Sequence, residues 1–183
     1  MQRVGALNRR RIIFCVISIL ICGAIIALDL ITKSYFERLN AENANNYHQV
    51  IIKDFFYLTY TVNTGAAFSF LGGVSWGQLF FKILTCLALA GFISLFVLFI
   101  KKGYRWMPIA MAFIVGGTIG NFYDRLAFDY VRDFIGFIFG NWHFPVFNIA
   151  DTFLTVGIIM FIVHVFFFDE NAIFKKKNEN PKD

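Results

Sequence analysis

Long apolar stretches separated by short polar segments dominate the chain. Four of them contain no Asp, Glu, Lys or Arg: residues 12–28, 83–100, 106–123 and 152–168. At about 1.5 Å of rise per residue in a helix, each covers roughly 26 Å, close to the bilayer hydrocarbon core of about 30 Å. A soluble protein would need polar helix faces to cover such segments. The pattern therefore predicts an all-α polytopic membrane protein with four transmembrane helices.

A different pattern lies between the first and second apolar stretches. Residues 55–62 alternate with a period of two, which is typical of a half-buried strand. One face would carry Phe56, Leu58, Tyr60 and Val62, and the other Tyr57, Thr59 and Thr61. Residues 63–65 (Asn-Thr-Gly) indicate a turn, residues 66–71 a returning strand, and residues 71–78 an interfacial loop with Trp76. We expect a small β-sheet, a β-cradle, between the first and second helices.

Composition supports the membrane class. Hydrophobic residues make up 58% of the 183 residues and charged residues only 16%, against about 25% charged in a typical soluble domain. This balance excludes a disordered chain, a coiled coil and a disulfide-stapled mini-protein, and it argues against a water-soluble globule. The chain is expected to form one membrane domain over residues 1–183.

The net charge of +5 reflects clusters at three places. Most Lys and Arg residues stand before residue 12, between residues 101 and 105, and in the tail over residues 169–183. Four helices would place these segments on one side, which the positive-inside rule assigns to the cytoplasm. Segments 29–82 and 124–151 would then be extracytoplasmic. A basic stripe for nucleic acid is absent from the sequence, so we expect no nucleic-acid partner.

Cysteine and histidine suggest no chemistry. Cys15, Cys22 and Cys86 lie inside apolar stretches, where they are expected to be small buried hydrophobic residues. His48, His143 and His164 have no metal-ligand spacing. We therefore predict no metal, no cofactor and no serine or cysteine nucleophile.

Polar residues gather at the outer ends of the third and fourth predicted helices. Gly117, Asn121 and Arg125 recur every four residues and share a helix face, while Asn148 and Asp151 are three residues apart. Helix capping would explain Asp151 alone. Several polar residues at one membrane depth favour a functional site. A small transporter or assembly factor with a polar binding cluster is the alternative to an enzyme, although the two halves show no internal repeat.

Carboxylates are the repeated reactive group on the outer side. The candidates are Asp29, Asp54, Asp124, Asp129, Asp133 and Asp151. Two adjacent carboxyls share a proton, so one can activate water while the other polarises a peptide carbonyl. Lys53 beside Asp54 and Arg125 beside Asp124 favour simple ionisation, while apolar neighbours of Asp133 would raise its pKa. Residue chemistry alone leaves the choice of pair open.

Five motifs occur in a recognisable order. They are LDLITK at 28–33, NTGAAFSFL at 63–71, GGTIGNFYDR at 116–125, VRDFI at 131–135 and FNIAD at 147–151. On a frame of four predicted helices, this set resembles the lipoprotein signal peptidases, the type II signal peptidases of bacteria. One departure is Arg132, where that family usually has a small or aliphatic residue. We expect Arg132 to alter the local charge beside Asp133.

The resemblance implies a membrane aspartyl endopeptidase with Asp133 and Asp151 as its catalytic dyad. Supporting or substrate-binding roles would fall to Asn63, Gly65, Gly117, Asn121, Asp124, Arg125 and Asn148. Asp29 and Lys33 would hold the outer end of the first helix.

It further implies a location in the bacterial cytoplasmic (inner) membrane and a prolipoprotein substrate. The enzyme would remove the signal peptide just before a cysteine that carries diacylglycerol, with the site at the extracytoplasmic face. Membrane lipid would be a further partner, and cyclic peptide antibiotics of the globomycin type would be inhibitors.

Overall fold

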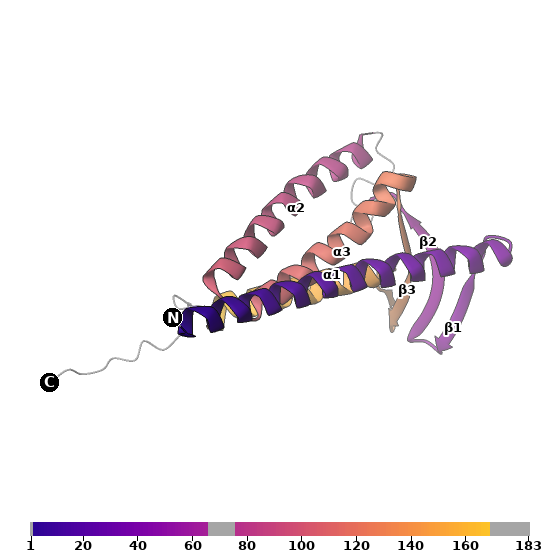
Figure 1. Cartoon of the computed structure of the whole chain (residues 1–183). Helices are drawn as coiled ribbons and strands as arrows, with labels where there is room; N and C mark the ends of the chain where they lie inside the picture. The colour runs from indigo at the N-terminus through magenta and orange to yellow at the C-terminus, as the bar shows by residue number, and fades with distance from the viewer. Residues whose placement is uncertain (1, 66–75, 169–183) are drawn as a thin grey trace.

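A computed structural model describes residues 2–65 and 76–168 of the chain. The elements are α1 (Gln2–Glu42), β1 (His48–Ile52), β2 (Phe56–Asn63), α2 (Gly77–Lys102), α3 (Met107–Phe128), β3 (Val131–Phe139), β4 (Trp142–His143), α4 (Ile149–Val163) and the π-helical turn η2 (His164–Phe168). The helices form an elongated bundle with the strands at one end (Figure 1). The start of α1 and the turn between α2 and α3 lie at the opposite end (Figure 1).

Three helical segments in the described residues are long and apolar enough to cross a membrane. They are Arg9–Glu42, Gly77–Lys102 and Ile149–Phe168. Large apolar side chains on these helices stay exposed, such as Leu20 and Leu87 at 67% each. Because soluble proteins rarely leave apolar surface this extensive, these faces fit a lipid environment. α3 is not among the three, so the crossing of all four helices stays a prediction.

α3 occupies the centre of the bundle and contacts the other three helices. Met107, Met111 and Ile114 form its buried core with aromatic side chains of α2 and with Leu154 of α4. Its last turns carry Asn121, Asp124 and Arg125, which lower its apolar character and bring polar groups to the sheet end. α3, the central helix of the bundle, therefore also buries polar side chains at its sheet end.

The sheet differs in origin from the prediction. β2 matches the predicted strand at 55–62, but its neighbours are β1 and β3, in the antiparallel order β1-β2-β3-β4. Strands β3 and β4 come from the segment between α3 and α4, so the expectation of a sheet confined to residues 29–82 is wrong. The predicted returning strand at 66–71, most of the interfacial loop at 71–78 and the tail at 169–183 lie outside the described residues.

One close approach and one irregularity shape the sheet. The ring of Tyr57, the buried side chain of β2, occupies the space that a Cβ at Gly136 of β3 would need. The β2–β3 register then shifts between Leu58 and Thr61, the residue that pairs with Asp133. Such a bulge bends a strand and re-aims its side chains. It lies beside the first of the predicted catalytic residues.

Candidate functional site

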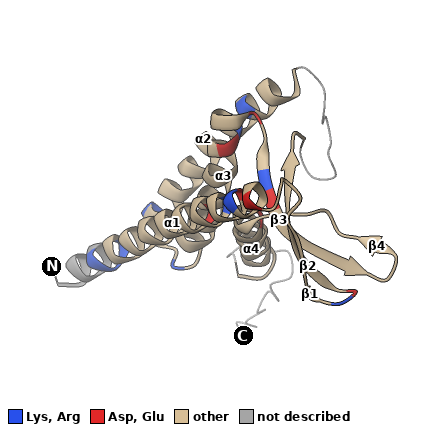
Figure 2. Ribbon diagram, turned by 90° about the vertical axis from the view of Figure 1, so that its right-hand side faces the viewer, with Lys and Arg blue, Asp and Glu red and all other residues tan. Residues whose placement is uncertain are grey.

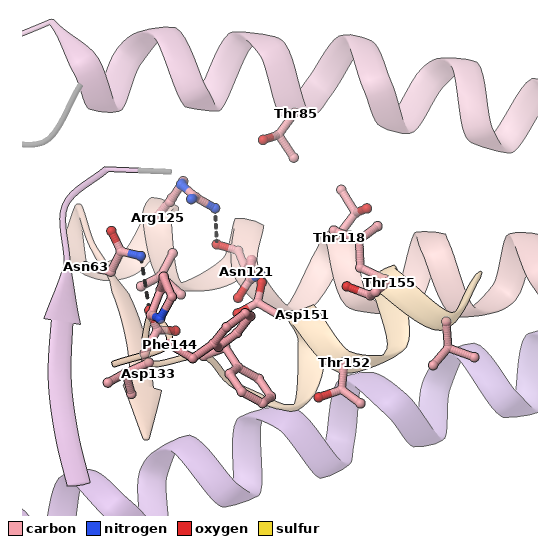
Figure 3. A pocket seen from close by; sticks show the side chains of 16 residues that line it. Asn63, Thr85, Thr118, Asn121, Arg125, Asp133, Phe144, Asp151, Thr152 and Thr155 are labelled. Carbon is pink, nitrogen blue, oxygen red and sulfur yellow. Dashed lines mark hydrogen bonds between the residues drawn. The ribbon is translucent and has the colours of Figure 1, made fainter. Parts of the chain in front are cut away.

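A cavity of about 640 Å³ opens where the helices meet the sheet. It is lined by Asn63, Thr85, Thr118, Asn121, Arg125, Val131, Asp133, Phe144, Pro145, Val146, Phe147, Asp151, Thr152, Leu154, Thr155 and Val156. Figure 3 shows Asn63, Asp133, Asn121 and Asp151 together at its sheet end, with Thr85, Thr118 and Thr155 further along the helices. Charged residues of both signs also gather at this junction (Figure 2).

Asp133 is held on β3 by two amide groups. Its Oδ1 accepts a hydrogen bond from Asn148 Nδ2 at 2.7 Å, and its Oδ2 accepts one from Asn63 Nδ2 at 3.1 Å. Only 2% of its surface is exposed. Burial, and then the nearby charge of Asp151, raise the pKa of Asp133 to about 7. The carboxyl can therefore exchange a proton near neutral pH.

Asp151 stands in the first turn of α4 and forms a capping box with Asn148. Asn148 Oδ1 accepts from the Asp151 backbone N at 3.0 Å, and Asp151 Oδ2 accepts from the Asn148 backbone N at 3.2 Å. The capping role that the sequence offered for Asp151 is thus present, and it does not stop the other carboxylate oxygen from facing the cavity. Because the Asn148 side chain also binds Asp133, one residue contacts both carboxylates.

Asn121 and Arg125 of α3 border the same space. Asn121 Nδ2 donates to Asp151 Oδ1 at 2.7 Å, so each carboxylate has a separate amide partner besides Asn148. Arg125 Nη2 donates to the carbonyl of Gly65 at 3.2 Å, and Gly65 N donates to Asn63 Oδ1 at 2.9 Å. Arg125 therefore ties α3 to the segment that follows β2.

A buried ionic cluster lies behind the cavity. The Lys33 ammonium is fully buried, 2.7 Å from Asp29 Oδ2 and 3.3 Å from Asp124 Oδ2, and it donates to Asn121 Oδ1 at 3.0 Å. Asp29 Oδ1 accepts from the Ala150 backbone N at 2.9 Å. The expected pair of Asp29 and Lys33 is therefore formed, inside α1, and it joins three helices below the site.

The structure separates the six carboxylates that the sequence left open. Asp29 and Asp124 are fully buried and ion-paired. Asp54 is exposed in the β1–β2 turn, and Asp129 is exposed beside Lys82. Among the described residues, only Asp133 and Asp151 offer carboxylates to the cavity.

Two residues singled out from the sequence do not face the cavity. Gly117 packs against α4, where an added Cβ would collide with the carbonyl of Ala150, so it permits close helix contact and does not line the cavity. Arg132 points away from Asp133, with its guanidinium on Asp124 and Glu37.

Much of the lining was missed by sequence reasoning. Residues 144–147 (Phe-Pro-Val-Phe) form one wall, just before Asn148, and threonines from three helices form another. The aromatic segment next to the FNIAD motif, and hydroxyls inside apolar stretches, were the available signals.

The described residues contain no group of three or more His, Cys, Asp or Glu that could hold a metal ion. The three cysteines are free thiols. Cys15 and Cys22 are only partly buried and Cys86 is exposed on α2, so the expectation that all three are buried is wrong. Within the described residues, α2 packs on α3 along one side, and large apolar side chains such as Leu87 are exposed on it.

Comparisons with known proteins agree with this architecture. A family model described as signal peptidase (SPase) II matches residues 11–167. A lipoprotein signal peptidase of Listeria welshimeri is 41% identical over 153 residues, covering 84% of this chain and 95% of the relative. One from Pseudomonas paraeruginosa is 37% identical over 143 residues, covering 78% and 83%. A solved structure described as a bacterial membrane enzyme aligns with a TM-score of 0.67 at 32% identity, over 80% of this chain and 85% of the other. The chain belongs to the signal peptidase II family.

Proposed function

We propose that the chain cleaves signal peptides from bacterial prolipoproteins, just before a cysteine that carries diacylglycerol, by aspartic catalysis at Asp133 and Asp151. Family membership supports the peptidase activity, and the names of the relatives support the lipoprotein substrate. The observation that carries the mechanism is that these two carboxylates face one cavity and share Asn148 as a hydrogen-bond partner.

The chemistry follows from one proton on the pair. The ionised carboxyl removes a proton from water, and the protonated carboxyl donates its proton to the oxygen of the scissile carbonyl as the water oxygen bonds to carbon. The tetrahedral intermediate then collapses with proton transfer to the leaving nitrogen. A pKa of about 7 for Asp133 supports a shared proton at neutral pH. The amides of Asn63 and Asn121 bind the two carboxylate oxygens that Asn148 does not bind, and so keep the carboxyls oriented.

The rest of the cavity suits a substrate that is anchored in lipid. Its walls are largely apolar, from residues 144–147 and from Leu154 and Val156 of α4. We infer that acyl chains and the signal helix lie along these walls while the peptide bond reaches the pair. A cyclic peptide antibiotic of the globomycin type would inhibit by filling the same space. In this proposal all four helices cross the membrane, both termini are cytoplasmic, and the site lies at the extracytoplasmic face.

The test is cleavage of a synthetic lipidated precursor peptide by the purified protein in detergent. We expect the unmodified protein to cleave it, and Asp133→Asn and Asp151→Asn each to lose nearly all activity. Asp54→Asn is the matched control, because it removes an exposed outer carboxylate outside the cavity. In cells, either dyad variant should accumulate uncleaved lipidated precursor. Wild-type turnover by either dyad variant would refute the dyad, and no cleavage by the unmodified protein would refute the activity.

A further inference from the structure

The buried side chain of Arg132 contacts two carboxylates and an aromatic ring. Its Nη2 and Nε bind Asp124 Oδ1 and Oδ2 at 2.7 and 3.2 Å, and its backbone N donates to Asp124 Oδ2 at 3.0 Å. Nη1 binds Glu37 Oε2 at 2.7 Å, and the guanidinium carbon lies 4.6 Å from the centre of the Phe128 ring. The side chain is 3% exposed. A two-pronged guanidinium–carboxylate contact holds both position and orientation.

These contacts lie on the face of β3 opposite the cavity. Neighbouring side chains of a strand point to opposite faces, so Arg132 and Phe134 face α1 and α3 while Asp133 faces the cavity. Phe134 stacks on Phe36 of α1 with ring centres 4.3 Å apart. The two side chains that flank Asp133 in sequence are therefore both anchored to helices.

The backbone at this point needs such anchoring. The bulge between Leu58 and Thr61 interrupts the β2–β3 ladder next to Asp133. The carbonyl of Arg132 accepts from Asn148 Nδ2 at 3.3 Å, and the same amide binds Asp133 at 2.7 Å. A displacement of Arg132 would move the amide that also orients the catalytic carboxyl.

Arg132 also balances charge. Asp29 and Asp124 are two buried carboxylates, and Lys33 and Arg132 are the two buried cations on them. Without Arg132, Lys33 would face both carboxylates alone, and the buried cluster would carry a net negative charge. Lys33 reaches the pair through Asn121, which binds Asp151.

We propose that Arg132 is a positioning residue, which fixes strand β3 behind Asp133 and neutralises the buried cluster beside the carboxylate pair. This role rests on the proposed function of Asp133 and Asp151. The charged groups around the pair and Arg132 are Asp29, Lys33 and Glu37 of α1, Asp124 and Arg125 of α3, and Arg132 itself on β3. The phenol of Tyr60 on β2 also interacts with the charges of Arg132 and Glu37. β2 contributes the neutral amide of Asn63.

The experiment measures kcat and KM on the lipidated precursor peptide from pH 5 to pH 9. For Arg132→Val we expect kcat to fall about ten- to a hundredfold with little change in KM, since a small misplacement of a catalytic group slows chemistry by this order. The alkaline limb of the kcat profile should also move to higher pH, because one positive charge is lost.

Two further variants separate position from charge. Arg132→Val combined with Asp124→Asn restores the charge balance of the buried cluster but lacks the Arg132–Asp124 ion pair. The alkaline limb of the kcat profile should therefore return to its original pH while kcat stays low. Arg132→Lys keeps the positive charge but cannot form the bidentate contact with Asp124. Its kcat should lie between those of wild type and Arg132→Val, and the alkaline limb of its kcat profile should not move. If Arg132→Val does not fold, Arg132→Lys carries the test, and a wild-type kcat in that variant would overturn the positioning role.

Asp129→Asn is the matched control, because Asp129 lies in the connection that leads from α3 into β3 but its side chain is 70% exposed. It should leave kcat and the pH profile unchanged. A wild-type kcat and pH profile in Arg132→Val would overturn the role of Arg132, and a limb that stays displaced in the double variant would overturn the charge balance. If Asp133→Asn cleaves normally, the proposed function itself fails. If Asp133→Asn is inactive and Arg132→Val is normal, only the role of Arg132 fails.

Discussion

Replacing Asp133 with Asn should change the stability of the protein in a pH-dependent way. In the folded protein the carboxyl is 2% exposed, and burial followed by the charge of Asp151 raises its pKa from 3.8 to about 7. Between these values the folded state binds more protons than the unfolded state. The stabilisation that proton binding by Asp133 contributes to the folded state is therefore fully present below about pH 4 and is lost as pH rises through about 7.

The size of this effect follows from the shift. Moving a pKa from 3.8 to about 7 corresponds to about 4 kcal/mol, of which about 3 kcal/mol is lost between pH 5 and pH 8. The amide introduced by Asp133→Asn has no proton to lose, so the variant lacks this dependence. It would also offer only one acceptor to Asn148 and Asn63, which costs about 1–3 kcal/mol at every pH. We expect the stability of the variant relative to wild type to rise by about 3 kcal/mol from pH 5 to pH 8, so that the variant is the more stable of the two at pH 8.

Thermal unfolding in detergent, followed by tryptophan fluorescence, measures this difference. The Tm of the variant relative to wild type should rise by roughly 6–12 °C between pH 5 and pH 8. Asp54→Asn, on an exposed carboxyl, should show no such trend. A Tm difference between Asp133→Asn and wild type that is constant from pH 5 to pH 8 would show that Asp133 does not hold a proton in the folded protein.

Three other predictions concern the pair, the buried cluster and the helix contact. Peptidase activity should decline as pH rises above about 7, because the carboxylate pair loses its shared proton; a profile that is flat to pH 9 would contradict this. Lys33→Met should cost about 3–5 kcal/mol in detergent unfolding, since it leaves buried carboxylates unpaired, whereas Lys82→Met on an exposed pair should cost less than about 1 kcal/mol. Equal losses would argue against the buried cluster. Gly117→Ala should lower the Tm by forcing α3 from α4, while Gly23→Ala, with open space around it, should leave the Tm unchanged or slightly higher; matching Tm values would exclude the close contact.

The elements with a local signal were predictable. Apolar stretches marked helices α1, α2, α3 and α4, and the alternation at 55–62 marked β2. β3 was not predicted, because its sequence VRDFIGFIF has no clean alternation between apolar and polar residues. It is a strand because β2, which is distant in the sequence, pairs with one side of it, and β4 and Phe147 pair with the other.

The carboxylate pair could not be chosen from the residues alone, because the partners of each carboxylate are brought close only by folding. Sequence neighbours suggested Arg125 as the partner of Asp124, but the actual partners are Lys33 and Arg132. Arg125 reaches instead to Gly65. The pKa of a carboxyl depends on burial and on charges brought close by folding, and neither is encoded in adjacent residues. The motif resemblance supplied the choice that residue chemistry left open.

The hydrogen bonds of Asn148 bear on when the protein can act during its own synthesis. Asp133 is held by Asn63, which precedes it by 70 residues, and by Asn148, which opens the last helix. A chain still emerging from the ribosome has the strands but lacks the helix that supplies Asp151 and half the partners of Asp133. On the proposed dyad, proteolytic activity requires α4 to be in place, so a nascent or partly inserted chain would present no assembled catalytic pair to the membrane around it.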